Sequence, residues 1–274
     1  MISLARRLVI FSTTAMQGNI MSARRLCGLF SGITACAVLL LVLAMGGESG
    51  AQSTADYAAI LAAPDRSDAD RQADTRRDPK PFLAFAGLRP GMKVLDMGAG
   101  GGYSSELIAR AVAPTGTVYA QNPPDLPDKP KARFEARVNT AAMRDVVVDV
   151  RPFDNPLSPD VRDLDLITFL FFYHDTTYMT VDRAEMNRKL LAALKPGGLF
   201  IVADHSALAG QGVSVAKTLH RIEEATLRAE IEAAGFHLAA EGNFWRNAND
   251  PHDFPSYQPT VPVDNFVLKF QKPM

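Results

Sequence analysis

From residue 93 onward, short apolar runs alternate with longer segments in which apolar residues recur at helical spacing. The apolar runs predict five strands, at residues 93–97, 116–120, 146–150, 164–172 and 199–203. The segments between them predict helices at residues 104–113, 131–142 and 180–194. Strands and helices that alternate in this way are typical of a parallel sheet covered by helices, so we expect an α/β fold.

The residues after the fifth strand predict one more helix and two more strands. The helix is expected at 217–234, where Gly235 ends it, and the strands at 236–240 and 265–270. A long loop rich in proline and asparagine separates these two strands, and loops of such length are more often functional than idle. The sequence therefore predicts one domain with a seven-stranded sheet over residues 91–274.

Ahead of that domain, residues 52–90 predict a helical extension. Acidic and basic residues are interleaved at 65–78, a pattern typical of a solvated helix face. Apolar residues follow at 82–85, and the turn residues Gly87 and Pro90 end the segment.

The first 51 residues resemble a secretory signal peptide. Arg24 and Arg25 precede an apolar run at 26–45, and small residues follow it up to position 51. A basic region, an apolar region and small residues at the cleavage site are the parts of such a signal. The basic region has ordinary proportions only when it is counted from Met21, so we expect translation to start there. The protein is then expected to be exported to the periplasm.

Three alternatives to an ordinary secretory signal peptide stay open at this point. An apolar run of about 20 residues can span a bilayer, so the segment is alternatively an uncleaved inner-membrane anchor. The residues that end at Cys36 resemble a lipoprotein cleavage box, although the most apolar stretch follows this cysteine instead of preceding it. Arg6 and Arg7, followed by apolar residues, resemble a twin-arginine signal, which exports folded proteins.

The composition limits the classes of partner. Of 274 residues, 47% are hydrophobic and 22% are charged, as in a globular protein. A formal net charge of -1 gives no general attraction to nucleic acid or anionic lipid. We therefore expect a small-molecule substrate, no nucleic acid, and membrane contact only through the N-terminal segment. Both cysteines, Cys27 and Cys36, precede the predicted domain, which thus has neither a disulfide nor a thiolate metal site.

A glycine-rich turn follows the first predicted strand. Asp96 stands at the tip of the strand, and Gly98, Gly100 and Gly102 allow the backbone to turn closely against a ligand. A dinucleotide-binding turn needs glycine at the place that Tyr103 occupies, and a phosphate loop needs a lysine that is missing here. The turn therefore favours a nucleotide-like cofactor other than NAD, FAD or ATP.

This acidic-x-Gly-x-Gly-x-Gly pattern resembles motif I of the class I S-adenosylmethionine-dependent methyltransferases. Residues 58–273 as a whole resemble a group of bacterial predicted methyltransferases that carry export signals. The shared segments are Gly87-Leu-Arg-Pro-Gly-Met-Lys-Val-Leu-Asp96, Lys195-Pro-Gly-Gly-Leu-Phe-Ile-Val-Ala-Asp-His205, Leu219-His220-Arg221, Ala234-Gly235-Phe236 and Asp264-Asn-Phe-Val-Leu-Lys-Phe270. The resemblance implies a Rossmann-like three-layer sandwich with a mostly parallel, seven-stranded sheet, and S-adenosylmethionine as the methyl donor.

The resemblance also implies which residues contact that cofactor. The methionine part would lie against the turn, at Asp96, Gly98, Ala99, Gly100 and Gly102, with Tyr103 beside it. The ribose would meet Gln121 or Asn122, where the family has a carboxylate; a neutral amide accepts a weaker hydrogen bond, so we expect weaker cofactor binding. The adenine amine would meet Asp154, which is alternatively a turn residue that caps local backbone.

Methyl transfer needs an aligned nucleophile and, where that nucleophile carries a proton, a base. Ligands of open parallel sheets bind at the carboxyl ends of the strands, and His174, Asp175, Asp204 and His205 are expected there. His174 and His205 are candidates for a base or for orienting the acceptor, because imidazole titrates near neutral pH. Asp175 and Asp204 would orient them, or alternatively cap a helix and hold a loop. We expect no metal site, because no His-x-x-x-His pair fixes two ligands on one helix face.

Other polar and aromatic residues are expected to have structural roles. His220 and Arg221, at the start of the late helix, are expected to serve surface ion pairs. Phe171 and Phe172 belong to an apolar run that is expected to be core. The sequence thus predicts an S-adenosylmethionine-dependent methyltransferase with a small-molecule acceptor. The alternative is an exported protein that binds S-adenosylmethionine or S-adenosylhomocysteine without catalysis, because this cofactor is made in the cytoplasm.

Overall fold

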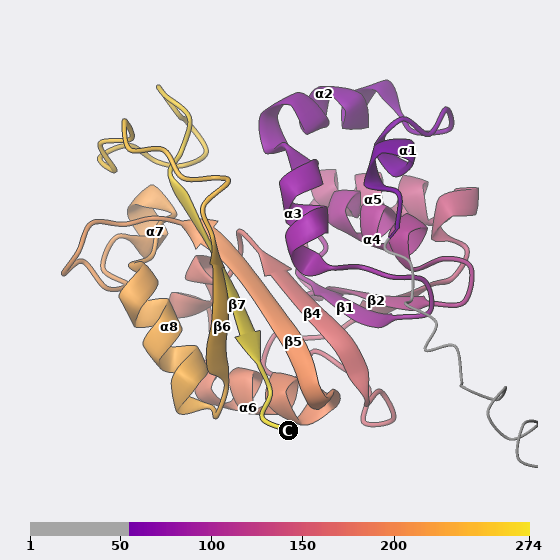
Figure 1. The fold of residues 1–274 in the computed structure, drawn as a ribbon. Helices are drawn as coiled ribbons and strands as arrows, with labels where there is room; N and C mark the ends of the chain where they lie inside the picture. Colours follow the sequence, from indigo (N-terminus) through magenta and orange to yellow (C-terminus); the bar gives the residue numbers. More distant parts are fainter. Residues whose placement is uncertain (1–54) are drawn as a thin grey trace, which may run out of the picture. The chain divides into compact units, whose positions relative to one another are not determined.

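Seven strands form one mixed sheet in the computed structural model, which describes residues 55–274 (Figure 1). The strands are β1 (Lys93–Met97), β2 (Thr117–Asn122), β3 (Val146–Val150), β4 (Leu164–Leu170), β5 (Leu194–His205), β6 (His237–Gly242) and β7 (Asn265–Gln271). Their order is β3-β2-β1-β4-β5-β7-β6; β1 to β5 pair in parallel, whereas β7 runs antiparallel to β5 and β6. The predicted α/β fold with a mostly parallel, seven-stranded sheet is confirmed. The predicted signal peptide and its alternatives lie outside the described residues.

Helices cover both faces of this sheet. They are α1 (Tyr57–Leu61), α2 (Asp68–Arg77), α3 (Pro79–Ala86), α4 (Tyr103–Val112), α5 (Asp128–Val138), α6 (Arg183–Ala193), α7 (Ala216–Leu219) and α8 (Glu224–Ala233), with 3-10 turns η1 (Ala141–Met143) and η2 (His174–Thr177). Helices α1 to α3, from the predicted extension, belong to the same compact unit as the sheet.

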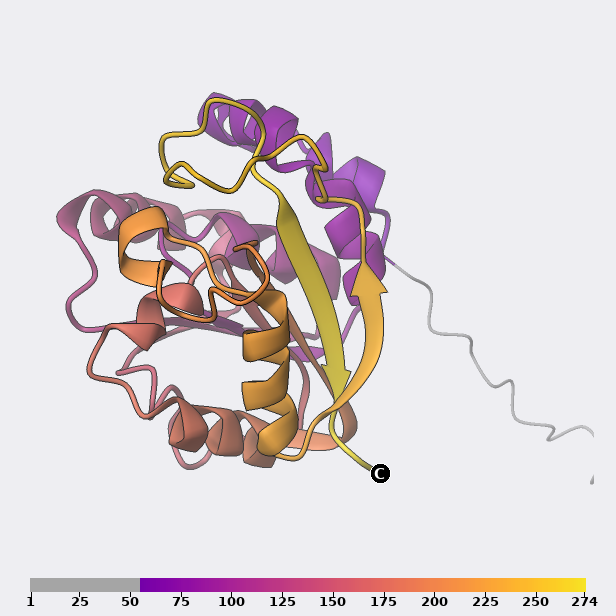
Figure 2. The same ribbon diagram turned by 90° about the vertical axis from the view of Figure 1, so that its left-hand side faces the viewer.

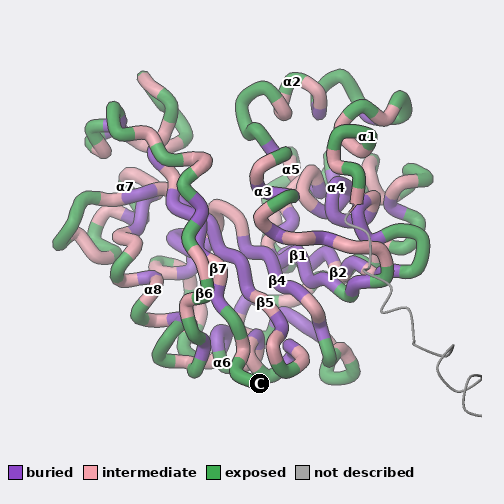
Figure 3. The backbone as a smooth tube through the Cα atoms, viewed as in Figure 1, coloured by how far each residue is buried: buried purple, intermediate pink, exposed green. Residues whose placement is uncertain are grey.

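Apolar side chains bury both faces of the sheet, which gives three layers. Along β1, Val94 belongs to a core with α3 and α4, whereas Leu95 belongs to a second core with α6 and α8. Because successive side chains of a strand point to opposite faces, a strand buried on both sides has a continuous apolar run. Figure 3 shows the buried residues concentrated in the strands, while the outer sides of the helices are exposed.

The predicted helix at 217–234 is wrong in one respect, because the chain forms two helices, α7 and α8, in place of one. His220 ends α7 in a left-handed conformation with φ of 50°. Arg221 is fully buried and pairs with Asp250 at 2.8 Å, and Ile222 forms a bridge with Ser206 beside β5. The prediction that Arg221 serves a surface ion pair is therefore also wrong. The buried pair holds the chain at Arg221 inside the protein, whereas a continuous helix would leave this residue at the surface.

Strands β4 and β5 end differently from the prediction. β4 stops at Leu170, because Phe171 has φ of 61° and leaves the extended conformation. Phe171 and Phe172 are consequently only half-buried, and the expectation that they are core is wrong. β5 runs from Leu194 to His205, so the two polar residues that follow the predicted strand lie within the observed one.

The N-terminal helices and the loop between β6 and β7 both lie at the carboxyl-end edge of the parallel strands (Figures 1 and 2). Trp245 of this loop stacks on Phe82 of α3 with ring centroids 5.6 Å apart. Its indole N–H donates to the carbonyl of Asp78 at 3.2 Å. No helix within residues 55–274 is long and apolar enough to cross a membrane.

Candidate functional site

The glycine-rich turn connects β1 to α4. Gly98, Gly100 and Gly102 have φ of 64°, 57° and 78°, in the left-handed region that favours glycine. A Cβ at Gly98 would lie 3.0 Å from the Phe169 ring, and one at Gly102 would lie 2.9 Å from the Arg137 side chain. At Gly100 the nearest atom would be 4.0 Å away, and this residue lines a cavity. The turn is therefore closely packed at its two ends and open at its centre.

Asp96 lies buried beneath the turn. Its Oδ2 accepts hydrogen bonds from the hydroxyls of Ser104 at 2.7 Å and Ser105 at 2.6 Å, and its Oδ1 accepts one from Thr168 at 2.8 Å. Burial raises the pKa of Asp96, and the three hydroxyls oppose that rise. The carboxyl group thus ties the start of α4 and strand β4 to the end of β1. Its contact with a cofactor stays a prediction.

Gln121 and Asn122, at the end of β2, are both buried and both bond to the turn. Gly98 N–H donates to Gln121 Oε1 at 3.0 Å, and Gln121 Nε2 donates to the Arg151 carbonyl at 2.6 Å. Gly100 N–H donates to Asn122 Oδ1 at 2.7 Å, and Asn122 Nδ2 donates to the Gly100 carbonyl at 3.2 Å. Asn122 therefore supports the turn at both ends of its amide, whereas Gln121 supports it through its oxygen and bonds to Arg151 through its nitrogen. Their predicted contact with a ribose stays a prediction.

A cavity of about 800 Å³ lies between the turn and α2. The residues that line it include Gly98, Ala99, Gly100, Gly101, Tyr103 and Ser104 from the turn and α4, Arg76 and Arg77 from α2, Arg133 and Arg137 from α5, and Phe171 and Phe172 after β4. Ligand sites of drug-sized molecules have volumes of about 300–1,000 Å³ and combine apolar walls with a few polar groups. This cavity has the size of such a site, and its lining combines the aromatic Phe171 and Phe172 with charged residues, among them four arginines.

Polar contacts hold α2 over the cavity. The Tyr103 hydroxyl donates to Asp74 Oδ1 at 2.5 Å, and Asp70 pairs with Arg137 at 2.7 Å. Burial and the neighbouring Asp74 raise the pKa of Tyr103, so the phenol keeps its proton. The Arg77 guanidinium lies 4.7 Å from the centroid of the Tyr103 ring. Helix α2 of the predicted extension is thus one wall of the cavity, and most of its residues are exposed to solvent.

Asp154, the residue predicted to meet adenine, follows β3 and is half-buried. Its carbonyl accepts a hydrogen bond from Lys189 Nζ at 2.9 Å. The preceding residue, Phe153, packs against Phe172 with ring centroids 5.0 Å apart, and Phe172 lines the cavity. Asp154 itself is not among the residues that line the cavity, and its adenine contact stays a prediction.

The predicted catalytic residues lie together at the ends of β4 and β5. His174 is buried; its Nδ1 lies 2.7 Å from Asp204 Oδ1, and its Nε2 lies 3.2 Å from Asp175 Oδ1. Burial alone would lower the pKa of His174, but Asp204 and Asp175 outweigh it and raise that pKa to about 10. In these surroundings the ring keeps its proton at neutral pH, so His174 is poorly suited to act as a base.

His220 joins this group from the end of α7. Its Nδ1 lies 3.2 Å from His174 Nε2 and 3.3 Å from Asp175 Oδ1. The Tyr178 hydroxyl also donates to Asp175 Oδ1. Sequence analysis missed both His220 and Tyr178 as members of the site. The break between α7 and α8, which brings His220 inward, depends on a distant ion pair that periodicity does not reveal.

His205 is the second predicted histidine of the site. Its Nδ1 lies 2.6 Å from Asn265 Oδ1, and Asn265 Nδ2 donates to the Val263 carbonyl at 3.2 Å. Because that carbonyl accepts from Nδ2, the amide oxygen faces the ring, and His205 Nδ1 must carry the proton. Nε2 then carries the lone pair. Burial lowers the pKa of His205, which keeps the ring neutral.

Phe171 connects His205 to the cavity over the glycine turn. Its ring stacks on that of His205 with centroids 5.0 Å apart and an interplanar angle of 19°. Phe171 also lines the cavity and lies 5.4 Å from the Trp245 ring. The chain therefore places a neutral imidazole beside an aromatic wall of the cavity.

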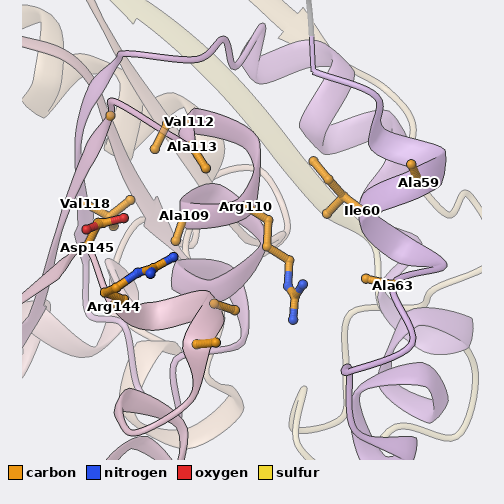
Figure 4. A pocket seen from close by; sticks show the side chains of 13 residues that line it. Ala59, Ile60, Ala63, Ala109, Arg110, Val112, Ala113, Val118, Arg144 and Asp145 are labelled. Carbon is orange, nitrogen blue, oxygen red and sulfur yellow. The ribbon is translucent and has the colours of Figure 1, made fainter.

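A second pocket, of about 370 Å³, lies between α1 and α4 (Figure 4). Ile60, Ala109 and Val112 give it apolar walls, and Arg144 and Asp145 stand at its side. It reaches the start of β2, at the edge of the sheet opposite the glycine turn. It is therefore not part of the candidate site.

Comparison with known sequences gives similarity to methyltransferases over less than half of the chain. The chain is 30% identical over 125 residues to the ubiquinone/menaquinone biosynthesis C-methyltransferase UbiE of Cupriavidus taiwanensis, covering 45% of this chain and 47% of that protein. It is 31% identical over 122 residues to the protein-L-isoaspartate O-methyltransferase of Pyrococcus horikoshii, covering 44% and 48%. Each match thus spans about half the length of the relative. No family model matches the chain.

Comparison with solved structures shows the fold. A SAM-dependent methyltransferase from Aquifex aeolicus superposes with a TM-score of 0.53 at 18% identity, covering 74% of this chain and 97% of that one. The [4+2]-cyclase SpnF superposes with a TM-score of 0.53 at 16% identity, covering 75% and 82%. The protein therefore has the Rossmann-like fold of class I methyltransferases. Because a cyclase shares this fold, the reaction must be argued from the site.

Proposed function

We propose that the protein is an S-adenosylmethionine-dependent methyltransferase that acts on a small-molecule acceptor. The observation that carries this proposal is the glycine turn at the carboxyl edge of the sheet, open at Gly100 toward a cavity of about 800 Å³. Similarity to two methyltransferases and the fold shared with a third support it. The closed ends of the turn, at Gly98 and Gly102, keep its backbone in one conformation against the ligand.

The side chains around the cavity suit this cofactor. Arg77 lines the cavity and makes no ion pair with any residue in the described part of the chain. Its guanidinium would bind the carboxylate of the cofactor's amino acid end, since such charge-assisted hydrogen bonds are strong. Phe172, next to Phe153 and Asp154, would give the adenine an aromatic surface. Asp96, Gln121 and Asn122 would hold the turn in place from below.

The bound cofactor would supply an electrophilic methyl group on its sulfonium. His205 would accept the proton of the acceptor, because its Nε2 carries a lone pair and its ring packs on a cavity wall. His174 and Asp175 would orient polar groups of the acceptor instead of removing its proton. These side chains do not line the cavity themselves, so the acceptor would have to extend past Phe171 to reach them.

Calorimetry with the full-length protein tests the cofactor part of this proposal. S-adenosylmethionine and S-adenosylhomocysteine are both expected to bind with one site per chain. Formation of S-adenosylhomocysteine with mixed small-molecule extracts then tests turnover. Binding without turnover would favour the alternative, a non-catalytic cofactor-binding protein, and absence of binding to either compound would contradict both.

We also propose that the protein is exported to the periplasm by a signal that is cleaved before Gln52, on the basis of the sequence pattern alone. Fractionation of cells and N-terminal sequencing of the periplasmic form test this. Retention of the full chain in the inner membrane would support the anchor instead. Export that fails when Arg6 and Arg7 are replaced by lysine would show that translation starts at Met1 and uses the twin-arginine route.

A further inference from the structure

His174, Asp175 and His220 place three ligand atoms at the corners of a nearly equilateral triangle. His174 Nε2 lies 3.2 Å from His220 Nδ1 and 3.2 Å from Asp175 Oδ1, and His220 Nδ1 lies 3.3 Å from Asp175 Oδ1. Ligand atoms about 2.0–2.1 Å from a tetrahedral zinc ion are separated by about 3.3–3.4 Å. At the same bond lengths, octahedral neighbours would be only about 2.8–3.0 Å apart. The triangle therefore matches one face of a tetrahedral site more closely than one face of an octahedron.

We propose that these three residues bind a divalent transition-metal ion of the zinc type, with the fourth position open to water or to an acceptor group. Two imidazole nitrogens and one carboxylate oxygen suit zinc, whereas magnesium and calcium prefer oxygen ligands alone. A site with three protein ligands and one open position is typical of catalytic zinc. The inference goes beyond the proposed function, because it does not depend on binding of S-adenosylmethionine.

Asp204 holds His174 in the orientation that a metal ligand needs. Asp204 is fully buried and accepts from the His174 backbone N–H at 2.8 Å, while its other oxygen lies 2.7 Å from the ring Nδ1. The ring is therefore fixed with Nε2 turned toward the triangle. Metal-binding histidines usually donate their other ring N–H to a carboxylate or carbonyl in this way, which sets the tautomer.

The backbone of His220 has a conformation that is uncommon for a residue other than glycine. His220 ends α7 with φ of 50°, in the left-handed region. Strained backbone of this kind persists where the surroundings fix it, and it clusters at functional sites. The His220 ring packs edge-on against Tyr257 with centroids 5.0 Å apart, and its side chain is 33% exposed. The exposed side of His220 gives an ion a path into the triangle.

Hydrogen bonding alone is the competing explanation of this cluster. A protonated His174 between the carboxylates of Asp204 and Asp175 would also satisfy the contacts, with a proton where the ion would be. The two explanations differ in what the protein binds. A hydrogen-bonded cluster takes up no metal, whereas a metal site takes up one equivalent and loses it when a ligand is removed.

Cobalt binding to the full-length protein, without an affinity tag and after dialysis against a chelator, distinguishes the two. Co²⁺ replaces zinc and gives intense visible absorption when it is tetrahedral, so the site itself is observed. We expect one equivalent of Co²⁺ with this absorption, displaced by Zn²⁺. The variant His220→Ala is expected to lose the absorption and to bind at least tenfold more weakly. Asp204→Asn is expected to weaken binding about 10- to 100-fold, as loss of an outer partner does.

The matched control is His237→Ala, which removes an exposed histidine on β6 and should bind cobalt as the unmodified protein does. Circular dichroism verifies that each variant is folded; if Asp204→Asn does not fold, the comparison of His220→Ala with His237→Ala still decides. Absence of cobalt binding by the unmodified protein would overturn the proposal. Equal binding by His220→Ala would do so as well.

Discussion

The hydroxyl of Tyr103 donates a 2.5 Å hydrogen bond to the carboxylate of Asp74, and this bond joins the glycine turn to the helix that covers it. Tyr103 takes the place where a dinucleotide-binding turn has glycine. The side chain that disfavours one class of cofactor therefore anchors the wall of the cavity proposed for another. Helix α2 is strongly polar, and its only buried residue is Asp70. Polar contacts, not apolar packing, therefore hold it at the cavity.

Tyr103→Phe tests whether this bond closes the cavity. The variant is expected to bind S-adenosylmethionine about tenfold more weakly, because a hydrogen bond to a charged group contributes about 1.5–3 kcal/mol. Calorimetry measures the affinity. Tyr57→Phe is the matched control, since the Tyr57 hydroxyl donates to the Leu88 carbonyl at 3.0 Å, away from the cavity. Equal affinity of the two variants would argue against a role of α2 in binding.

The variant Gln121→Glu tests whether Gln121 binds the ribose of the cofactor or mainly supports the glycine turn. If Gln121 served mainly the ribose, a carboxylate would strengthen cofactor binding. In the structure its Nε2 donates to the Arg151 carbonyl, so glutamate would place a buried carboxylate against that carbonyl. We therefore expect a loss of about 1–3 kcal/mol in the free energy of unfolding and no gain in affinity. Denaturant unfolding and calorimetry measure the two quantities, and tighter binding would restore the ribose role.

The sheet could be predicted from the sequence because its signals are local. The apolar run of β1 and the glycine-rich turn that follows it depend only on neighbouring residues. What could not be predicted depends on distant partners. The break at His220 follows from the pair of Arg221 with Asp250, 29 residues later, and no periodicity encodes it. For the same reason the sequence did not indicate that His220 and Tyr178 lie beside His174 and Asp175.

Gly100→Ala tests the open face of the turn. Alanine at φ of 57° is strained by about 1–2 kcal/mol, and its methyl group would project where the cofactor is proposed to lie. Gly210→Ala is the control, because Gly210 has φ of 82°, has no atom within 4 Å of the place that a methyl group would take, and does not line the cavity. Similar losses of stability are expected in both variants, with weaker S-adenosylmethionine binding only in Gly100→Ala. Unchanged binding in both would place the cofactor elsewhere.

The buried pair of Arg221 with Asp250 predicts a loss of stability in acid. Burial alone would raise the pKa of Asp250, but Arg221 and the backbone N–H groups of Asp264 and His252 lower it below its usual 3.8. Because the folded-state pKa is the lower one, the stabilisation is complete above about pH 4 and is lost as the pH falls through the folded-state value.

Asp250→Asn isolates this contribution. The variant is expected to lose about 3–5 kcal/mol at neutral pH, since it leaves a buried guanidinium without its partner. Its free energy of unfolding should then fall less steeply than that of the unmodified protein below pH 4, by up to about 1.4 kcal/mol per pH unit. Urea unfolding at several pH values measures both slopes. Parallel slopes would mean that Asp250 does not set the acid sensitivity.

His205→Gln tests the base in the proposed reaction. Glutamine keeps a polar side chain of similar length beside Asn265 but cannot accept and release a proton. Removal of a general base lowers rates by about 10²- to 10⁴-fold, so the rate at which S-adenosylmethionine is converted to S-adenosylhomocysteine in the presence of an acceptor should fall by that factor. Affinity for S-adenosylmethionine should not change, because His205 touches the cavity only through Phe171.

His252→Gln, in the loop between β6 and β7, is the control. A rate that survives in His205→Gln would assign proton removal to water, and the histidine would then serve only to position Phe171.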